Sequence, residues 1–167
     1  IKKETQFTDS QEERLARGIG FPVGLSLNEC AAHWTPNPLD TQPALGKNDL
    51  IKIGYGVHYK GCIVDGAYSF SFNPELNPLI QVAEEATQLA IKNSGPDAIL
   101  GEIGGVVQEF IENQEIMIGN KLVPLKSFKD LTGHKIIPWM IHADKCVPNF
   151  KITYPLRMED GEFYAIE

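Results

Sequence analysis

Residues 50–74 read LIKIGYGVHYKGCIVDGAYSFSFNP, and this stretch decides the fold. Two β-type runs, residues 50–57 and 62–70, flank a short segment with Lys60 and Gly61, which is typical of a β-hairpin. If the loop centres on Tyr59 and Lys60, facing residues have numbers that sum to about 119. Gly54 then lies opposite Asp65, within one or two residues. The sequence therefore predicts an antiparallel hairpin with a carboxylate on its second strand.

Two amphipathic helices are expected after this hairpin. Residues 74–93 carry an apolar stripe that ends at Gly95 and Pro96. Asp97 can cap a second helix, whose apolar residues recur at helical spacing: Leu100, Ile103, Val107, Phe110 and Ile111. Further strands are predicted at residues 115–118, 136–142, 151–154 and 162–167. This order of elements indicates the α+β class.

Before the hairpin, residues 7–17 resemble the end of a helix stopped by Gly18 and Gly20. Residues 21–27 suit a short strand, and residues 35–43 carry three prolines and form a loop. No domain linker stands out. We therefore expect residues 1–167 to form a single domain.

Composition narrows the class of protein. The 167 residues are enough for one domain with a core, and no apolar run approaches the roughly 20 residues that span a bilayer. The three cysteines are widely spaced, which favours unpaired thiols in a reducing compartment. A net charge of −7 argues against binding to the phosphates of nucleic acids. We expect a soluble, cytoplasmic protein without nucleic-acid or membrane partners.

Five polar residues lie beside apolar or glycine-rich runs: His33, Asp65, His134, His142 and Glu167. Taken singly, each has an ordinary structural explanation, such as a strand end for Asp65 or a surface loop for His134. Pro138 lies between His134 and His142, so these histidines do not share one face of a regular helix. Spacing alone therefore assigns none of the five a chemical role.

A resemblance that covers nearly the whole chain adds what spacing cannot. Five segments resemble, in the same order, segments of type 2 methionine aminopeptidases, which have the pita-bread fold. Besides the hairpin they are GIGFPVGLSLNECAAHWTPNP (residues 18–38), LTGHKI (131–136), MIHADKCVPN (140–149) and RMEDGEFYAIE (157–167). The segment EIMIGNKLVPLKSFKDLTGH (115–134) favours type 2 over type 1. The resemblance implies a curved antiparallel sheet backed by helices, with two divalent metal ions on its concave face.

The resemblance also implies roles for individual residues. Three match metal ligands: Asp65, His134 and Glu167. Two match the non-ligand histidines that contact the substrate and stabilise the reacting amide: His33 and His142. Two match the walls of the apolar pocket that accepts the methionine side chain: Phe21 and Ile141.

Two metal ions that share bridging carboxylates lower the pKa of a bound water, so that hydroxide is available near neutral pH. Oxygen ligands with one imidazole suit Mn, Co, Fe or Zn. In this chain Gly54 occupies the position of the family's first aspartate ligand, eleven residues before Asp65. The family's last glutamate ligand would lie after Glu167, so we expect a fold incomplete at its C-terminus and a site for one metal ion or none.

The resemblance implies a metal-dependent aminopeptidase that removes the initiator methionine from nascent polypeptides, with an impaired metal site. Gly54 leaves an alternative open: a catalytically inactive pita-bread relative that acts as a binding module, for example at the ribosome. A third reading is an inactive fragment of a longer enzyme.

Overall fold

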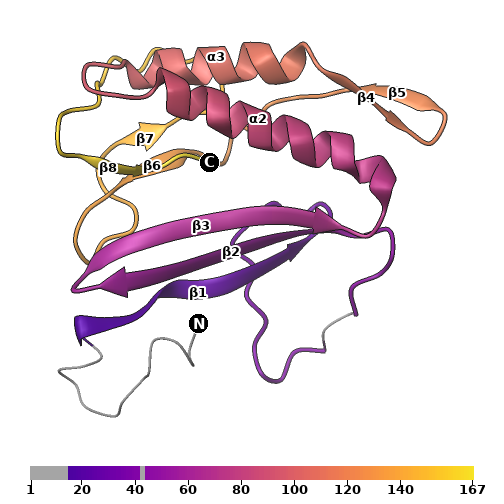
Figure 1. Ribbon diagram of the computed structural model, residues 1–167, viewed down its shortest axis with the longest axis horizontal. Coiled ribbons are helices and arrows are strands. Elements are labelled where there is room, and N and C mark those ends of the chain that lie inside the picture. Colours follow the sequence, from indigo (N-terminus) through magenta and orange to yellow (C-terminus); the bar gives the residue numbers. More distant parts are fainter. Residues whose placement is uncertain (1–14, 42–43) are drawn as a thin grey trace. The chain divides into compact units, whose positions relative to one another are not determined.

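Three antiparallel strands form the sheet of the first of two units into which the chain folds: β1 (Arg17–Leu27), β2 (Leu50–Tyr59) and β3 (Cys62–Ser71), in the order β1-β2-β3 (Figure 1). The computed structural model describes residues 15–41 and 44–167. The first unit holds the described residues up to Pro74 together with Pro138–Ile141. The second holds Glu75–Ile137 and His142–Glu167. The expectation of a single domain stays a prediction.

The predicted hairpin is confirmed, but its register differs by two residues from the expected one. Its two central turn residues are Lys60 and Gly61, with φ of 49° and 85°, and Tyr59 pairs with Cys62. Positive φ at both central residues is what a tight hairpin turn requires, which is why glycine takes the second position. Facing residues therefore have numbers that sum to 121, so that Asp65 faces Gly56 and Gly54 faces Ala67.

Strand β1 contains the predicted strand at residues 21–27 and begins earlier, at Arg17. It pairs antiparallel with β2, and its register shifts between Ile19 and Phe21 and again between Phe21 and Gly24. Such shifts are the signature of β-bulges, which bend a strand. The predicted helix at residues 7–17 falls mostly outside the described residues, and its last residue belongs to β1.

The second unit is built on α2 (Asn77–Asn93), which follows the short η1 (Pro74–Leu76), and α3 (Leu100–Glu112). Both helices were predicted. They meet in a core formed by Ala90, Leu100, Ile103, Val107, Val147 and Met158. No helix in the described part of the chain is both long and apolar enough to cross a bilayer.

The start of α3 differs from the prediction. Its N-cap residue is Ile99, no side chain caps the helix, and Asp97 has a φ of 68°. The backbone N–H groups of Leu100 and Gly101 instead donate to the carbonyl oxygens of Leu156 and Tyr154, at 2.9 and 3.1 Å. These bonds satisfy N–H groups that a helix cannot pair internally. The segment predicted as a strand at residues 151–154 therefore runs beside the helix and forms no strand.

Glycines in α3 allow this close approach, and they predict opposite effects of two neighbouring substitutions. A Cβ on Gly104 would lie 2.8 Å from the carbonyl oxygen of Pro148, whereas a Cβ on Gly105 would lie 3.7 Å from the nearest atom, in Lys151. We expect Gly104→Ala to lower the free energy of unfolding by about 1–3 kcal/mol through overpacking. Gly105→Ala should raise it by up to about 1 kcal/mol, because alanine favours helix.

Denaturant unfolding of both variants checks this pair, because they share one helix and one chemical change. Equal effects of the two substitutions would contradict the packing described for α3.

Short strands complete the second unit. The hairpin of β4 (Glu115–Ile118) and β5 (Lys121–Pro124) precedes a three-stranded sheet of order β7-β6-β8, formed by β6 (Gly133–Ile136), β7 (Cys146–Val147) and β8 (Phe163–Ala165). The prediction for residues 136–142 is wrong beyond Ile136. Pro138 has no N–H to donate and Trp139 has a φ of 67°, so the ladder cannot continue.

Candidate metal centre

One face of the β1–β3 sheet carries the first group of predicted site residues. Because side chains alternate along a strand, the register places Gly54, Gly56, Asp65 and Ala67 on the same face. Gly54 is the diagonal neighbour of Asp65 rather than its direct partner. Side chains at diagonal positions still reach each other when they are long enough. The corrected register therefore keeps position 54 beside Asp65.

Phe21 lies on this face as well. It pairs with Gly56 in the neighbouring strand, and a Cβ added to Gly56 would clash with the Phe21 ring. The ring therefore packs against the backbone of Gly56, next to Asp65 in the register. The sheet thus brings a predicted pocket wall and a predicted metal ligand onto one surface.

Gly54 differs from Gly56 in its surroundings. A Cβ built on Gly54 meets no atom within 4 Å, and Gly54 is not among the glycines with positive φ. A side chain at this position would meet neither a clash nor backbone strain. The position that resembles the family's first aspartate ligand therefore lacks a carboxylate but has room for one.

The second group of predicted residues lies in the β7-β6-β8 sheet. His134 is in the central strand, between Cys146 and Ala165, and is 5% exposed. Its Nε2 lies 2.9 Å from Oε1 of Glu167, which follows β8. Gly133 lets β6 and β8 lie this close together, because a Cβ on it would lie only 2.6 Å from the carbonyl oxygen of Ala165. An imidazole nitrogen and a carboxylate oxygen thus lie side by side.

His142 joins this pair. Its ring packs edge-on against the ring of His134, with 4.1 Å between centroids and 89° between planes. The structure therefore brings together His134, His142 and the more distant Glu167. Nitrogen and oxygen donors of this kind suit divalent transition metals such as Mn, Fe, Co or Zn, so the chemistry of the pair fits a metal ion.

The other two predicted residues belong to the first unit. His33 lies in the loop after β1, is exposed, and has a φ of 64°. A positive φ is uncommon for a residue with a side chain and marks local strain. Ile141 is half-buried in the segment Pro138–Ile141. Their predicted roles at the substrate stay predictions.

A buried ionic cluster beside His134 was not predicted. The Glu162 carboxylate, 10% exposed, lies 2.7 Å from Nζ of Lys135 and 2.8 Å from Nζ of Lys145. Lys145 also donates to Glu159 and to the carbonyl oxygen of Arg157. No sequence pattern marks this cluster, because lysine and glutamate are ordinarily surface residues.

Hydrogen bonds set the charges of the cluster. Burial raises the pKa of Glu162, but hydrogen bonds from Lys135, Lys145, Tyr164 and the Glu159 backbone outweigh it and hold this pKa well below its usual value. Hydrogen bonding to Lys135, 3.2 Å away, lowers the pKa of Asp144. The negative charge that Asp144 adds near His142 is thus paired with a lysine.

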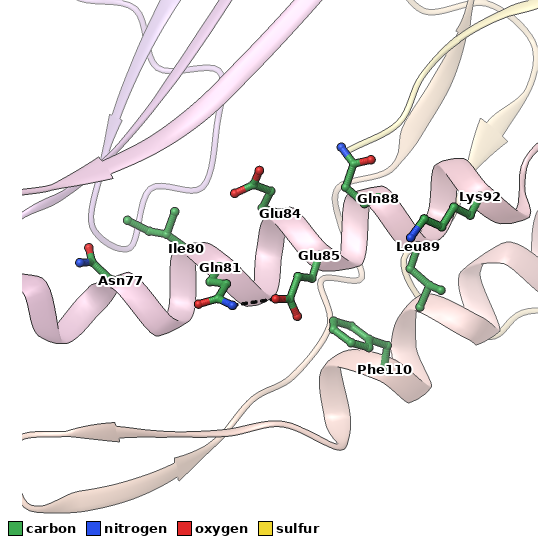
Figure 2. A pocket seen from close by; sticks show the side chains of 9 residues that line it. All are labelled: Asn77, Ile80, Gln81, Glu84, Glu85, Gln88, Leu89, Lys92 and Phe110. Atoms are coloured by element: carbon green, nitrogen blue, oxygen red, sulfur yellow. Dashed lines mark hydrogen bonds between the residues drawn. The ribbon is translucent and has the colours of Figure 1, made fainter.

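A surface groove of about 850 Å³ lies elsewhere in the second unit. It runs along α2 and is closed on one side by Phe110 of α3 (Figure 2). Gln81 and Glu85, two of the residues that line it, hydrogen-bond to each other at 2.7 Å (Figure 2). None of the predicted site residues lines this groove, so it is not the candidate site.

The three cysteines, Cys30, Cys62 and Cys146, are free, as predicted.

Comparison with known proteins places the chain in a family. The family model of metallopeptidase family M24 matches residues 2–167. Methionine aminopeptidase 2-2 of Talaromyces marneffei is 44% identical over 155 residues, which is 93% of this chain and 34% of the relative. Methionine aminopeptidase 2 of Laccaria bicolor is also 44% identical, over 94% of this chain and 44% of the relative. The chain thus spans between a third and a half of the length of these curated relatives.

A solved structure supports the fold. The crystal structure of methionine aminopeptidase from Rickettsia prowazekii matches with a TM-score of 0.70 at 23% identity, over 86% of this chain and 54% of that one. This likeness and the antiparallel sheets with helices confirm the predicted α+β, pita-bread class. The chain therefore belongs to metallopeptidase family M24, in the branch that resembles type 2 methionine aminopeptidases.

Proposed function

We propose that the protein is a metal-dependent aminopeptidase that removes the initiator methionine from nascent polypeptides in the cytoplasm. The observation that carries this proposal is the 2.9 Å approach of His134 Nε2 to Glu167 Oε1, with His142 packed against the same imidazole. The names of the relatives support the choice of substrate.

Each residue has a part in this proposal. His134 and Glu167 would hold the metal ion, and Asp65 is the third ligand that the resemblance implies. When bound, a divalent ion such as Mn, Co, Fe or Zn would lower the pKa of a bound water and polarise the scissile carbonyl group. His142 and His33 hydrogen-bond to the scissile amide, where a donor stabilises the charge that builds up on oxygen.

The remaining residues select the substrate. Phe21 and Ile141 form an apolar surface against which a methionine side chain fits, because a thioether is apolar and adaptable in shape. Binding this side chain places the first peptide bond at the metal. The amide of a nascent polypeptide is thereby held where His142 and His33 reach it.

His134→Ala tests the metal centre. In the full-length protein, dialysed against Co²⁺ or Mn²⁺ and then freed of excess ion, we expect this variant to lose its bound metal. It should also lose more than about 100-fold in methionyl-peptide hydrolysis, which exceeds the effect of removing even an outer partner of a metal ligand. His58→Ala is the matched control and should keep its metal content. Equal metal in His134→Ala and the parent would contradict the proposal.

One observation favours a second candidate function. Gly54 has no side chain where the resemblance expects a metal ligand. The second candidate is therefore an inactive relative that acts as a binding module, for example on the ribosome. This candidate predicts co-sedimentation with ribosomes and no hydrolysis of methionyl peptides. The aminopeptidase proposal predicts hydrolysis.

A further inference from the structure

The turn of the β2–β3 hairpin, at Lys60 and Gly61, contacts the segment Pro138–Ile141, which lies nearly 80 residues later in the sequence. The N–H of Trp139 donates to the carbonyl oxygen of Gly61 at 2.9 Å. The Trp139 ring lies 5.0 Å from the ring of His58, tilted by 55°. One backbone contact and one ring contact thus fasten Pro138–Ile141 to the hairpin.

The turn is shaped for this contact. A Cβ on Gly61 would lie 2.5 Å from Cε2 and Nε1 of the Trp139 indole, so the ring packs directly on the glycine backbone. Trp139 itself has a φ of 67°, an uncommon conformation for a bulky side chain, which persists only where its surroundings impose it. The hydrogen bond and the ring contact are the surroundings that do so.

The contacts of Trp139 with Gly61 and His58, here called the clamp, position the segment Pro138–Ile141 more than they bury apolar surface. Trp139 is 57% exposed, so most of its ring is in contact with water and adds little to a core. Its contacts instead fix the path of the chain two residues before Ile141. Phe21 belongs to the same unit. It lies in β1, which pairs with β2 of the hairpin that Trp139 contacts.

We propose that Trp139 is a positioning residue: by holding Pro138–Ile141 on the hairpin turn, it sets where Ile141 stands relative to the Phe21 sheet and so determines binding of the apolar N-terminal side chain. This inference rests on the proposed function, because that function gives Ile141 and Phe21 their roles. Trp139 would thus join Phe21 and Ile141 as a residue that determines specificity, without itself touching the substrate.

The kinetic test compares three variants of the full-length protein. Trp139→Ala should raise KM for a methionyl peptide about tenfold, the scale at which small changes in an apolar pocket act, with little change in kcat. Trp139→Phe keeps a ring over Gly61 and should recover most of the loss. Tyr59→Ala removes an exposed aromatic ring from the end of the same hairpin and is the control, with KM expected to stay at the parent value.

A second readout does not depend on catalysis. Calorimetry with free L-methionine should show binding about tenfold weaker in Trp139→Ala, with unchanged metal content. Hydrogen exchange of peptides that cover residues 138–141 should be faster in this variant. If methionine binding falls while no form hydrolyses peptides, the aminopeptidase proposal fails and the positioning role stands. Parent-like methionine binding in Trp139→Ala, or no methionine binding by the parent, overturns the inference.

Discussion

Gly54→Asp is expected to raise the bound divalent metal from at most one ion per chain to two and to increase methionyl-peptide hydrolysis by more than about 100-fold. The new carboxylate would stand diagonally across β2 and β3 from Asp65, on the same face. Gly54 offers open space and an ordinary backbone, so the substitution should leave the fold intact. Elemental analysis and a hydrolysis assay on the full-length protein measure both effects.

Ser69→Asp is the matched control for this change. It adds the same charge to the same face of the hairpin, on β3, four residue pairs along the register from Asp65, where Ser69 faces Lys52. We expect no second metal ion and no gain in turnover from it. A parent protein that already binds two ions and turns over rapidly would show that Gly54 impairs nothing. A Gly54→Asp protein without turnover would instead favour the binding module.

Glu162→Gln is expected to lower the free energy of unfolding by about 3 kcal/mol at neutral pH, because it leaves two lysines without their shared carboxylate in a buried site. Lys145 is as buried as Glu162, with 8% of its side chain exposed against 10% for Glu162. Denaturant unfolding of the full-length protein measures the loss. Glu159→Gln is the control: Glu159 contacts the same lysine at 2.7 Å, but its side chain is 73% exposed. An exposed ion pair contributes at most about 1 kcal/mol.

The pH dependence of this effect has a definite sign. The pKa of Glu162 is lower in the folded protein than its ordinary value of 4.5. Its carboxylate therefore stabilises the fold fully above about pH 4.5 and progressively less as the pH falls from there toward the folded-state pKa. The difference in stability between the parent and Glu162→Gln should narrow from pH 7 to pH 3. A difference that widens on acidification would contradict the assigned ion pairs.

The hairpin could be predicted from the sequence because its β-type runs are local, but its register depended on one glycine. A loop centred on Tyr59 and Lys60 leaves out of account that Gly61 suits the positive φ of the second turn position. A two-residue turn that contains glycine, Gly119-Asn120, also joins β4 to β5. This pattern could have revealed that hairpin as well.

Elements whose form depends on distant partners were harder to predict. Residues 151–154 have a strand-like composition, yet Tyr154 accepts its hydrogen bond from α3 rather than from a strand. The candidate site shows both outcomes. His134, His142 and Glu167 were identified by resemblance and lie together, whereas the cluster around Glu162 depends on burial that no local pattern reports.

The two glycines on the Asp65 face also have an evolutionary consequence. Every glycine codon is one nucleotide away from a codon for aspartate or glutamate, so a carboxylate at position 54 is one point mutation away, and the open space around Gly54 would not oppose the change. At Gly56 the same mutation would expel the Phe21 ring. The packing around Gly54 therefore leaves this position free to change, whereas contact with the Phe21 ring restricts position 56 to glycine.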